Sequence, residues 1–123
     1  MTGRRVLQAT LGLALARFNE RRFAEAEALY RQALVEAPDN ADALNMLGLV
    51  FAEAGNPLQA IKYIDQALRR EPNRAAFHTN RGEILPRWGL VDEGLEACRR
   101  AGELDPNAAE VRNNLGLALR GKG

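Results

Sequence analysis

Apolar residues recur three and four positions apart through most of the chain, in stretches that are broken by short polar segments rich in proline, glycine and asparagine. This spacing is typical of amphipathic helices. Proline and glycine in the breaks end one helix, and asparagine or aspartate can cap the next. The chain is therefore predicted to be all-α, with about seven helices. We expect them at residues 5–20, 22–36, 41–54, 57–70, 75–87, 91–104 and 109–120.

The breaks repeat at a fixed interval. Pro38, Pro72 and Pro106 stand 34 residues apart, and this period divides the chain into similar units. We expect repeats at 7–40, 41–74 and 75–108, then a half repeat or capping helix at 109–120, all in one solenoid domain. Small residues recur at fixed places in each unit, among them Ala14, Gly48, Gly82 and Gly116 at the eighth place. Small side chains where two helices cross let the helices approach closely, so each unit reads as a packed helix pair.

The period and the small places resemble the tetratricopeptide repeat family across nearly the whole chain. The resemblance implies a right-handed α-solenoid of stacked antiparallel helix pairs, in which the first helix of each unit lines a concave groove. It also implies an interaction module that binds a protein or peptide and is not itself an enzyme.

The family pattern assigns the groove to particular places in each first helix. At the apolar end it implies the contacts Leu11, Leu15, Phe18 and Leu49. At the polar end it implies Asn45, Thr79, Asn80, Glu83, Asn113 and Asn114. Asparagine donates and accepts hydrogen bonds, which suits it to the backbone of an extended peptide. This resembles the asparagine ladder of protein O-linked N-acetylglucosamine transferases, although Met46 and Gly12 interrupt it. The alternative that these amides bond helix ends or water stays open.

Another binding mode of the family is disfavoured by the residues present. Repeats that clamp the carboxylate tail of chaperones need lysine, arginine and asparagine at set places. Leu11, Leu15, Met46 and Ala76 occupy those places in one register, and only Asn80 matches in the other register.

The sequence offers little material for catalysis. His78 is the single histidine and Cys98 the single cysteine, and both fall at packing places of their units. The glycines form no phosphate-binding loop. We therefore predict no cofactor and no metal. A net charge of +1 argues against nucleic acid, and no apolar run reaches the roughly 20 residues that span a membrane. One thiol fits a reducing compartment, so a cytoplasmic location is predicted.

Three local features qualify this interpretation. The first 17 residues could also be a short signal peptide, but Gln8 and Thr10 interrupt the apolar run and fit the repeat. Pro86 predicts a kink or an early helix end near Leu85. Arg21 stands where the other units have glycine, so the first turn could differ from the others.

The unfinished fourth unit and the apolar ends of the chain leave two further hypotheses open. The chain could be the N-terminal arm of a larger enzyme such as a glycosyltransferase, presenting substrates to a catalytic domain. It could also assemble with itself through the terminal helices, because Val111, Leu117 and Leu119 would be only partly covered.

Overall fold

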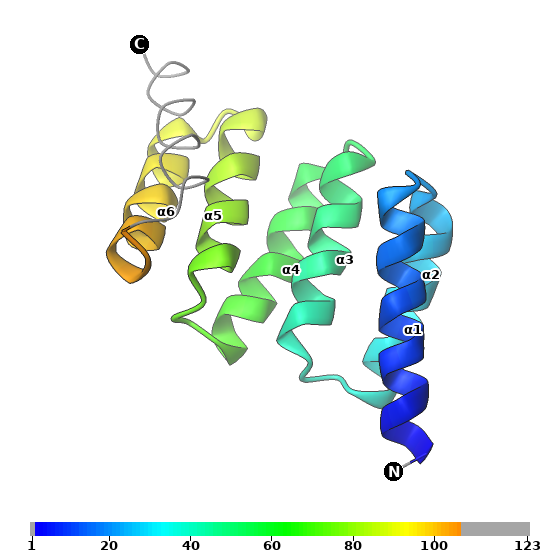
Figure 1. Cartoon of the computed structure of the whole chain (residues 1–123). Helices are drawn as coiled ribbons and strands as arrows, with labels where there is room; N and C mark the ends of the chain where they lie inside the picture. The colour runs from blue at the N-terminus through cyan, green and yellow to red at the C-terminus, as the bar shows by residue number, and fades with distance from the viewer. Residues whose placement is uncertain (1, 107–123) are drawn as a thin grey trace.

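The computed structural model describes residues 2–106, and this part of the chain is a row of helices joined by short turns (Figure 1). The six α-helices are α1 (Thr2–Asn19), α2 (Phe23–Glu36), α3 (Ala41–Glu53), α4 (Pro57–Arg70), α5 (Ala75–Ile84) and α6 (Val91–Leu104). A 3₁₀ turn, η1 (Leu85–Trp88), follows α5. The predicted helix at 109–120, with Asn113 and Asn114, lies outside the described residues.

The helices stack as pairs in chain order. α1 packs on α2, α3 on α4 and α5 on α6, while α2–α3 and α4–α5 contacts join one pair to the next. The first helices α1, α3 and α5 stand side by side on the near side of Figure 1, and the second helices lie behind them. The predicted α-solenoid is therefore confirmed for residues 2–106. α1 is a helix packed into this stack, as the repeat interpretation of the N-terminus predicts.

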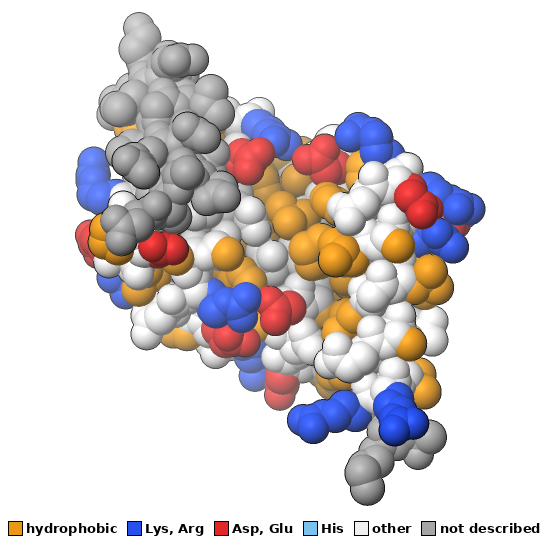
Figure 2. Space-filling model, viewed as in Figure 1, with side chains coloured by type: hydrophobic (Ala, Val, Ile, Leu, Met, Phe, Trp, Pro, Cys, Tyr) orange, Lys and Arg blue, Asp and Glu red, His pale blue; other side chains and the backbone are white. Residues whose placement is uncertain are grey.

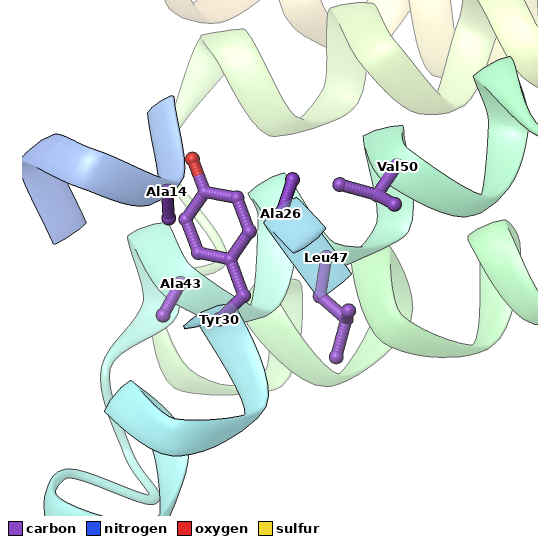
Figure 3. Packing of buried hydrophobic residues seen from close by; sticks show 6 residues of the cluster. All are labelled: Ala14, Ala26, Tyr30, Ala43, Leu47 and Val50. Carbon is purple, nitrogen blue, oxygen red and sulfur yellow. The ribbon is translucent and has the colours of Figure 1, made fainter. Parts of the chain in front are cut away.

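One core cluster joins the first two pairs (Figure 3). Tyr30 of α2 is its largest buried side chain, and its ring lies among small and aliphatic neighbours from α1 and α3. Those neighbours include Ala14, Ala43 and Leu47. Burial raises the pKa of the Tyr30 hydroxyl to about 12, so this side chain stays uncharged at alkaline pH where an exposed tyrosine ionises.

Helices meet closely at two of the predicted small places. A Cβ atom added to Gly48 would lie 2.7 Å from Cγ1 of Ile64 and 2.9 Å from the carbonyl oxygen of Ala60. A Cβ on Gly82 would collide with the Cys98 sulfur. Glycine therefore sets the spacing of the α3–α4 and α5–α6 pairs.

Pro86 ends its helix as predicted. α5 stops at Ile84, the chain continues as the 3₁₀ turn η1, and Gly89 closes it with a φ of 84°. The ring of Pro86 also lies against α6. A Cβ on Gly94 would stand 2.7 Å from Cγ of Pro86, so glycine there makes room for the ring.

The helix caps differ between the two links that join successive pairs. Asn40 accepts a hydrogen bond from the Ala43 N–H at 2.9 Å, as an N-cap should. Before α5, however, Arg74 holds the N-cap position and makes no side-chain cap. Arg74 instead donates to Asp42 at 2.7 Å and to Glu71 at 3.0 Å, which ties this link to α3.

The turn at Arg21 has the same form as the glycine turns, contrary to the expected difference. Arg21 adopts a left-handed φ of 62°, beside 84° at Gly55 and Gly89. The backbone hydrogen bonds also match, since Arg22 N–H donates to Arg17 at 2.8 Å just as Asn56 N–H donates to Phe51 at 2.8 Å. The helix-ending motif therefore imposes the left-handed conformation even without glycine.

This strained turn gives a stability prediction. Arg21→Gly should raise the free energy of unfolding by about 0.5–1 kcal/mol, because a left-handed non-glycine residue costs about 1–2 kcal/mol and the exposed stacking of Arg21 on Phe23 offsets part of that. Urea unfolding followed by circular dichroism measures the change. Gly55→Ala is the reciprocal control and should lower stability by about 1 kcal/mol. A loss of stability in Arg21→Gly would contradict the prediction.

Candidate interaction surface

The first helices together present one broad surface, which we call the first-helix face: the side of α1, α3 and α5 that faces the viewer in Figures 1 and 2. Hydrophobic side chains gather over its α1–α3 part in Figure 2. The predicted apolar contacts come from these helices. Leu11 and Phe18 are partly buried against the core below, as is Leu49, whereas Leu15 is exposed.

Met46 belongs with these apolar residues, although in the sequence pattern it interrupts the row of amides. It is partly buried and packs on the same cluster as Leu11 and Phe18. Met46 holds the sixth place in its unit, which the family pattern assigns to the groove, and this place was the signal in the sequence that could have identified it. An unbranched thioether adapts to differently shaped partners, so Met46 extends the apolar part of the surface.

Two of the predicted polar contacts meet each other across helices. The Asn80 side-chain amide donates to the side-chain oxygen of Asn45 at 3.0 Å, which links α5 to α3. Asn45 is only 6% exposed, while Asn80 is half-buried. Asn45 therefore fixes the orientation of Asn80. The second amide hydrogen and the oxygen of Asn80 make no other hydrogen bond within residues 2–106.

Thr79 and Glu83 are placed differently from each other. Thr79 is 8% exposed and its hydroxyl donates to the Ala75 carbonyl at 3.0 Å, so most of it lies inside the helix layer. Glu83 is exposed and accepts from Arg87 at 2.8 Å, and Arg87 also lies 3.9 Å from Glu53. This exposed group of charges has two carboxylates for one guanidinium. Among the predicted polar residues within 2–106, Asn80 and the ion-paired Glu83 are therefore the two that are not buried.

His78 and Cys98 are held by structural contacts. His78 Nε2 lies 2.8 Å from the Pro72 carbonyl oxygen, at the link between α4 and α5. Cys98 is fully buried between α5 and α6, and burial, with the nearby charge of Glu83, raises the pKa of its thiol. A raised pKa disfavours the reactive thiolate. In the described part of the chain, no three His, Cys, Asp or Glu residues lie together in a way that could hold a metal ion.

None of the helices within residues 2–106 is both long and apolar enough to cross a membrane. The cytoplasmic location stays a prediction.

The repeat is recognised directly by comparison with known families. A family model for the tetratricopeptide repeat matches residues 11–66 and again 45–109, which together span most of the sequence. The chain belongs to the tetratricopeptide repeat family. Among curated relatives, this tetratricopeptide protein is 33% identical over 94 residues to human tetratricopeptide repeat protein 36, covering 76% of this chain and 48% of the relative. It is 31% identical over 106 residues to cellulose synthase operon protein C of Pseudomonas fluorescens, covering 80% of this chain and 8% of that protein.

Solved structures extend the comparison to three dimensions. An O-GlcNAc transferase mutant of Thermobaculum terrenum superposes with a TM-score of 0.92 at 29% identity, covering 97% of this chain and 23% of the transferase chain. The first repeat domain of Spaghetti (RPAP3), bound to an HSP90 peptide, gives a TM-score of 0.87 at 17% identity and covers 93% of this chain and 90% of that domain. The second likeness shows the fold alone. The chain spans less than half the length of the curated relatives and under a quarter of the transferase.

Proposed function

We propose that this tetratricopeptide protein is an interaction module that holds an extended segment of a partner protein on its first-helix face. Apolar side chains of the segment would lie on the apolar part of the face, and its backbone would bond Asn80. Asn113 and Asn114 would continue the amide contacts. The observation that carries the proposal is the Asn80–Asn45 hydrogen bond of 3.0 Å, because it presents an oriented amide beside an exposed apolar surface.

The charges on the face indicate which segments it would not hold. A chaperone-type carboxylate clamp needs cations that are free to bind, yet Arg87 after α5 is shared between the carboxylates of Glu83 and Glu53. Arg74 and Arg81 of the same region are already paired with Asp42 and Asp65. An acidic tail would therefore meet repulsion here. The segment we expect is apolar at one end and free of acidic residues.

Two known structures with the same fold support a peptide as the partner. The Spaghetti (RPAP3) domain is bound to the HSP90 peptide SRMEEVD, and the Yersinia enterocolitica chaperone SycD is in complex with a peptide of the translocator YopD. At 17% and 18% identity these show what the fold can hold, while the residues above indicate which segment suits this chain.

A single exposed leucine tests the proposal. Peptides selected from a random library on the wild-type chain should bind Leu15→Glu about tenfold more weakly, because the charge would lose its hydration against an apolar segment. Fluorescence polarisation of labelled peptides measures the affinity. Val35→Glu is the matched control, since Val35 is 81% exposed on the second helix α2. If both variants weakened binding equally, or if neither weakened it, binding on the first-helix face would be contradicted.

A second candidate function is favoured by the transferase comparison. The likeness at 29% identity, with the sixth-place Asn80 and Asn114 of an asparagine ladder, supports a substrate-presenting arm of a larger enzyme. Sequencing the reading frame downstream of Gly123 tests this candidate. A catalytic domain in frame would support it, and a stop codon directly after Gly123 would contradict it.

A further inference from the structure

The outer face of α1, defined by Val6, Ala9 and Leu13, is an exposed apolar stripe on one side of the helix. The repeat shows what such a stripe normally meets. Ala43 and Leu47 occupy the same places on α3, and both are completely buried in the cluster that contains Tyr30 of α2. On α1 the corresponding leucine, Leu13, is 44% exposed. In Figure 2, hydrophobic side chains run along the right-hand edge of the molecule, where α1 stands.

The same helix carries uncompensated positive charge. α1 contains Arg4, Arg5 and Arg17 and no acidic residue. Arg17 is already paired, at 2.8 Å with Glu20 and 3.1 Å with Glu25. Arg4 and Arg5 are exposed and form no ion pair with any residue in 2–106. They stand in the first turns, where the helix dipole is also positive. An anionic partner would therefore be attracted to this end of the stripe.

We propose that the outer face of α1 docks an acidic amphipathic helix of a partner protein, seated as α2 is seated on α3. The repeat supplies the geometry, since α2–α3 packing buries the places that are open on α1. Arg4 and Arg5, which have no ion pair within residues 2–106, favour a partner helix with negative charge. A second copy of α1 fits less well, because it would bring the same arginines and no carboxylate.

α2 itself has the character that this partner requires. It carries Glu25, Glu27 and Glu36 against the single Arg31, and it already covers this kind of face within the chain. A synthetic peptide with the sequence Phe23–Glu36 and blocked ends is therefore a suitable probe. Its control is the same peptide with the three glutamates replaced by glutamine.

The test uses the whole 123-residue chain, labelled with ¹⁵N, titrated with the peptide to millimolar concentration. Chemical shifts should change at Val6, Ala9 and Leu13, and binding should weaken about threefold between about 0.05 M and 0.5 M salt. The glutamine peptide should bind more weakly and lose most of this salt dependence. Absence of shifts on the outer face would overturn the proposal.

Two variants of α1 locate the site and separate it from the first-helix face. Leu13→Glu should abolish the shifts, whereas Leu15→Glu, which alters the first-helix face, should leave them unchanged. Loss in Leu15→Glu alone would overturn the proposal. Light scattering over a range of concentrations tests whether a second copy of the chain covers this face instead. A dimer that Leu13→Glu dissociates would show that it does, and this result too would overturn the proposal.

Discussion

Leu47→Ala is expected to lower the free energy of unfolding by about 3 kcal/mol. Leu47 is 0% exposed, and it packs in the cluster of Tyr30 and Val50 that joins α2 to α3. Truncation removes buried apolar surface and leaves a cavity that the close-packed helices fill only in part. Urea unfolding followed by circular dichroism measures the loss.

Leu13→Ala is the matched control, because Leu13 holds the same place one repeat earlier. Its 44% exposure means that truncation should cost less than about 1 kcal/mol. If Leu13→Ala cost as much as Leu47→Ala, the outer face of α1 would have to be covered in solution. Comparing the loss at several protein concentrations would then identify self-association as the cause.

Gly48→Ala is expected to lower the free energy of unfolding by about 2 kcal/mol. The new methyl group would lie 2.9 Å from the Ala60 carbonyl oxygen, which is backbone and cannot move alone, and 2.7 Å from Ile64. α3 and α4 would have to separate along their contact. Thermal and urea unfolding measure the change.

Gly12→Ala makes the same substitution on the preceding first helix and should act in the opposite direction. A Cβ at Gly12 meets nothing within 4 Å, so only the gain in helix propensity remains. Stability should rise by about 0.5–1 kcal/mol. The same sign of change in both variants would contradict close packing at Gly48.

Much of the helical framework could be predicted from the sequence. Four of the six described helices begin where the pattern placed them. Of these, α4 (57–70) and α6 (91–104) also end there, whereas α3 (41–53) ends one residue early and α5 (75–84) three residues early. Local rules suffice for this: apolar spacing specifies helix, and proline limits it, as Pro86 does. The 34-residue period also predicts which helices pair, because small residues such as Gly48 recur where two helices cross.

The candidate surface was less predictable. The pattern placed Asn45 and Thr79 among the polar contacts, but the packing of α3 and α5 covers most of both side chains. It passed over Met46, which lies with the apolar contacts. A place in a repeat assigns a side chain to one side of a helix, but how much of it stays exposed depends on the neighbouring helix.

The sequence by itself determined the helices, their pairing and the small residues at the crossings, because these depend on spacing along one chain. The tertiary structure decided how residues at the same place in different repeats differ in burial and in backbone conformation. Leu13 and Leu47 share a place, yet only Leu47 has a helix packed over it. Arg21 takes a conformation that suits glycine, because the turn between two packed helices requires it. Burial and turn geometry depend on what lies next to a residue in space, which the local pattern does not contain.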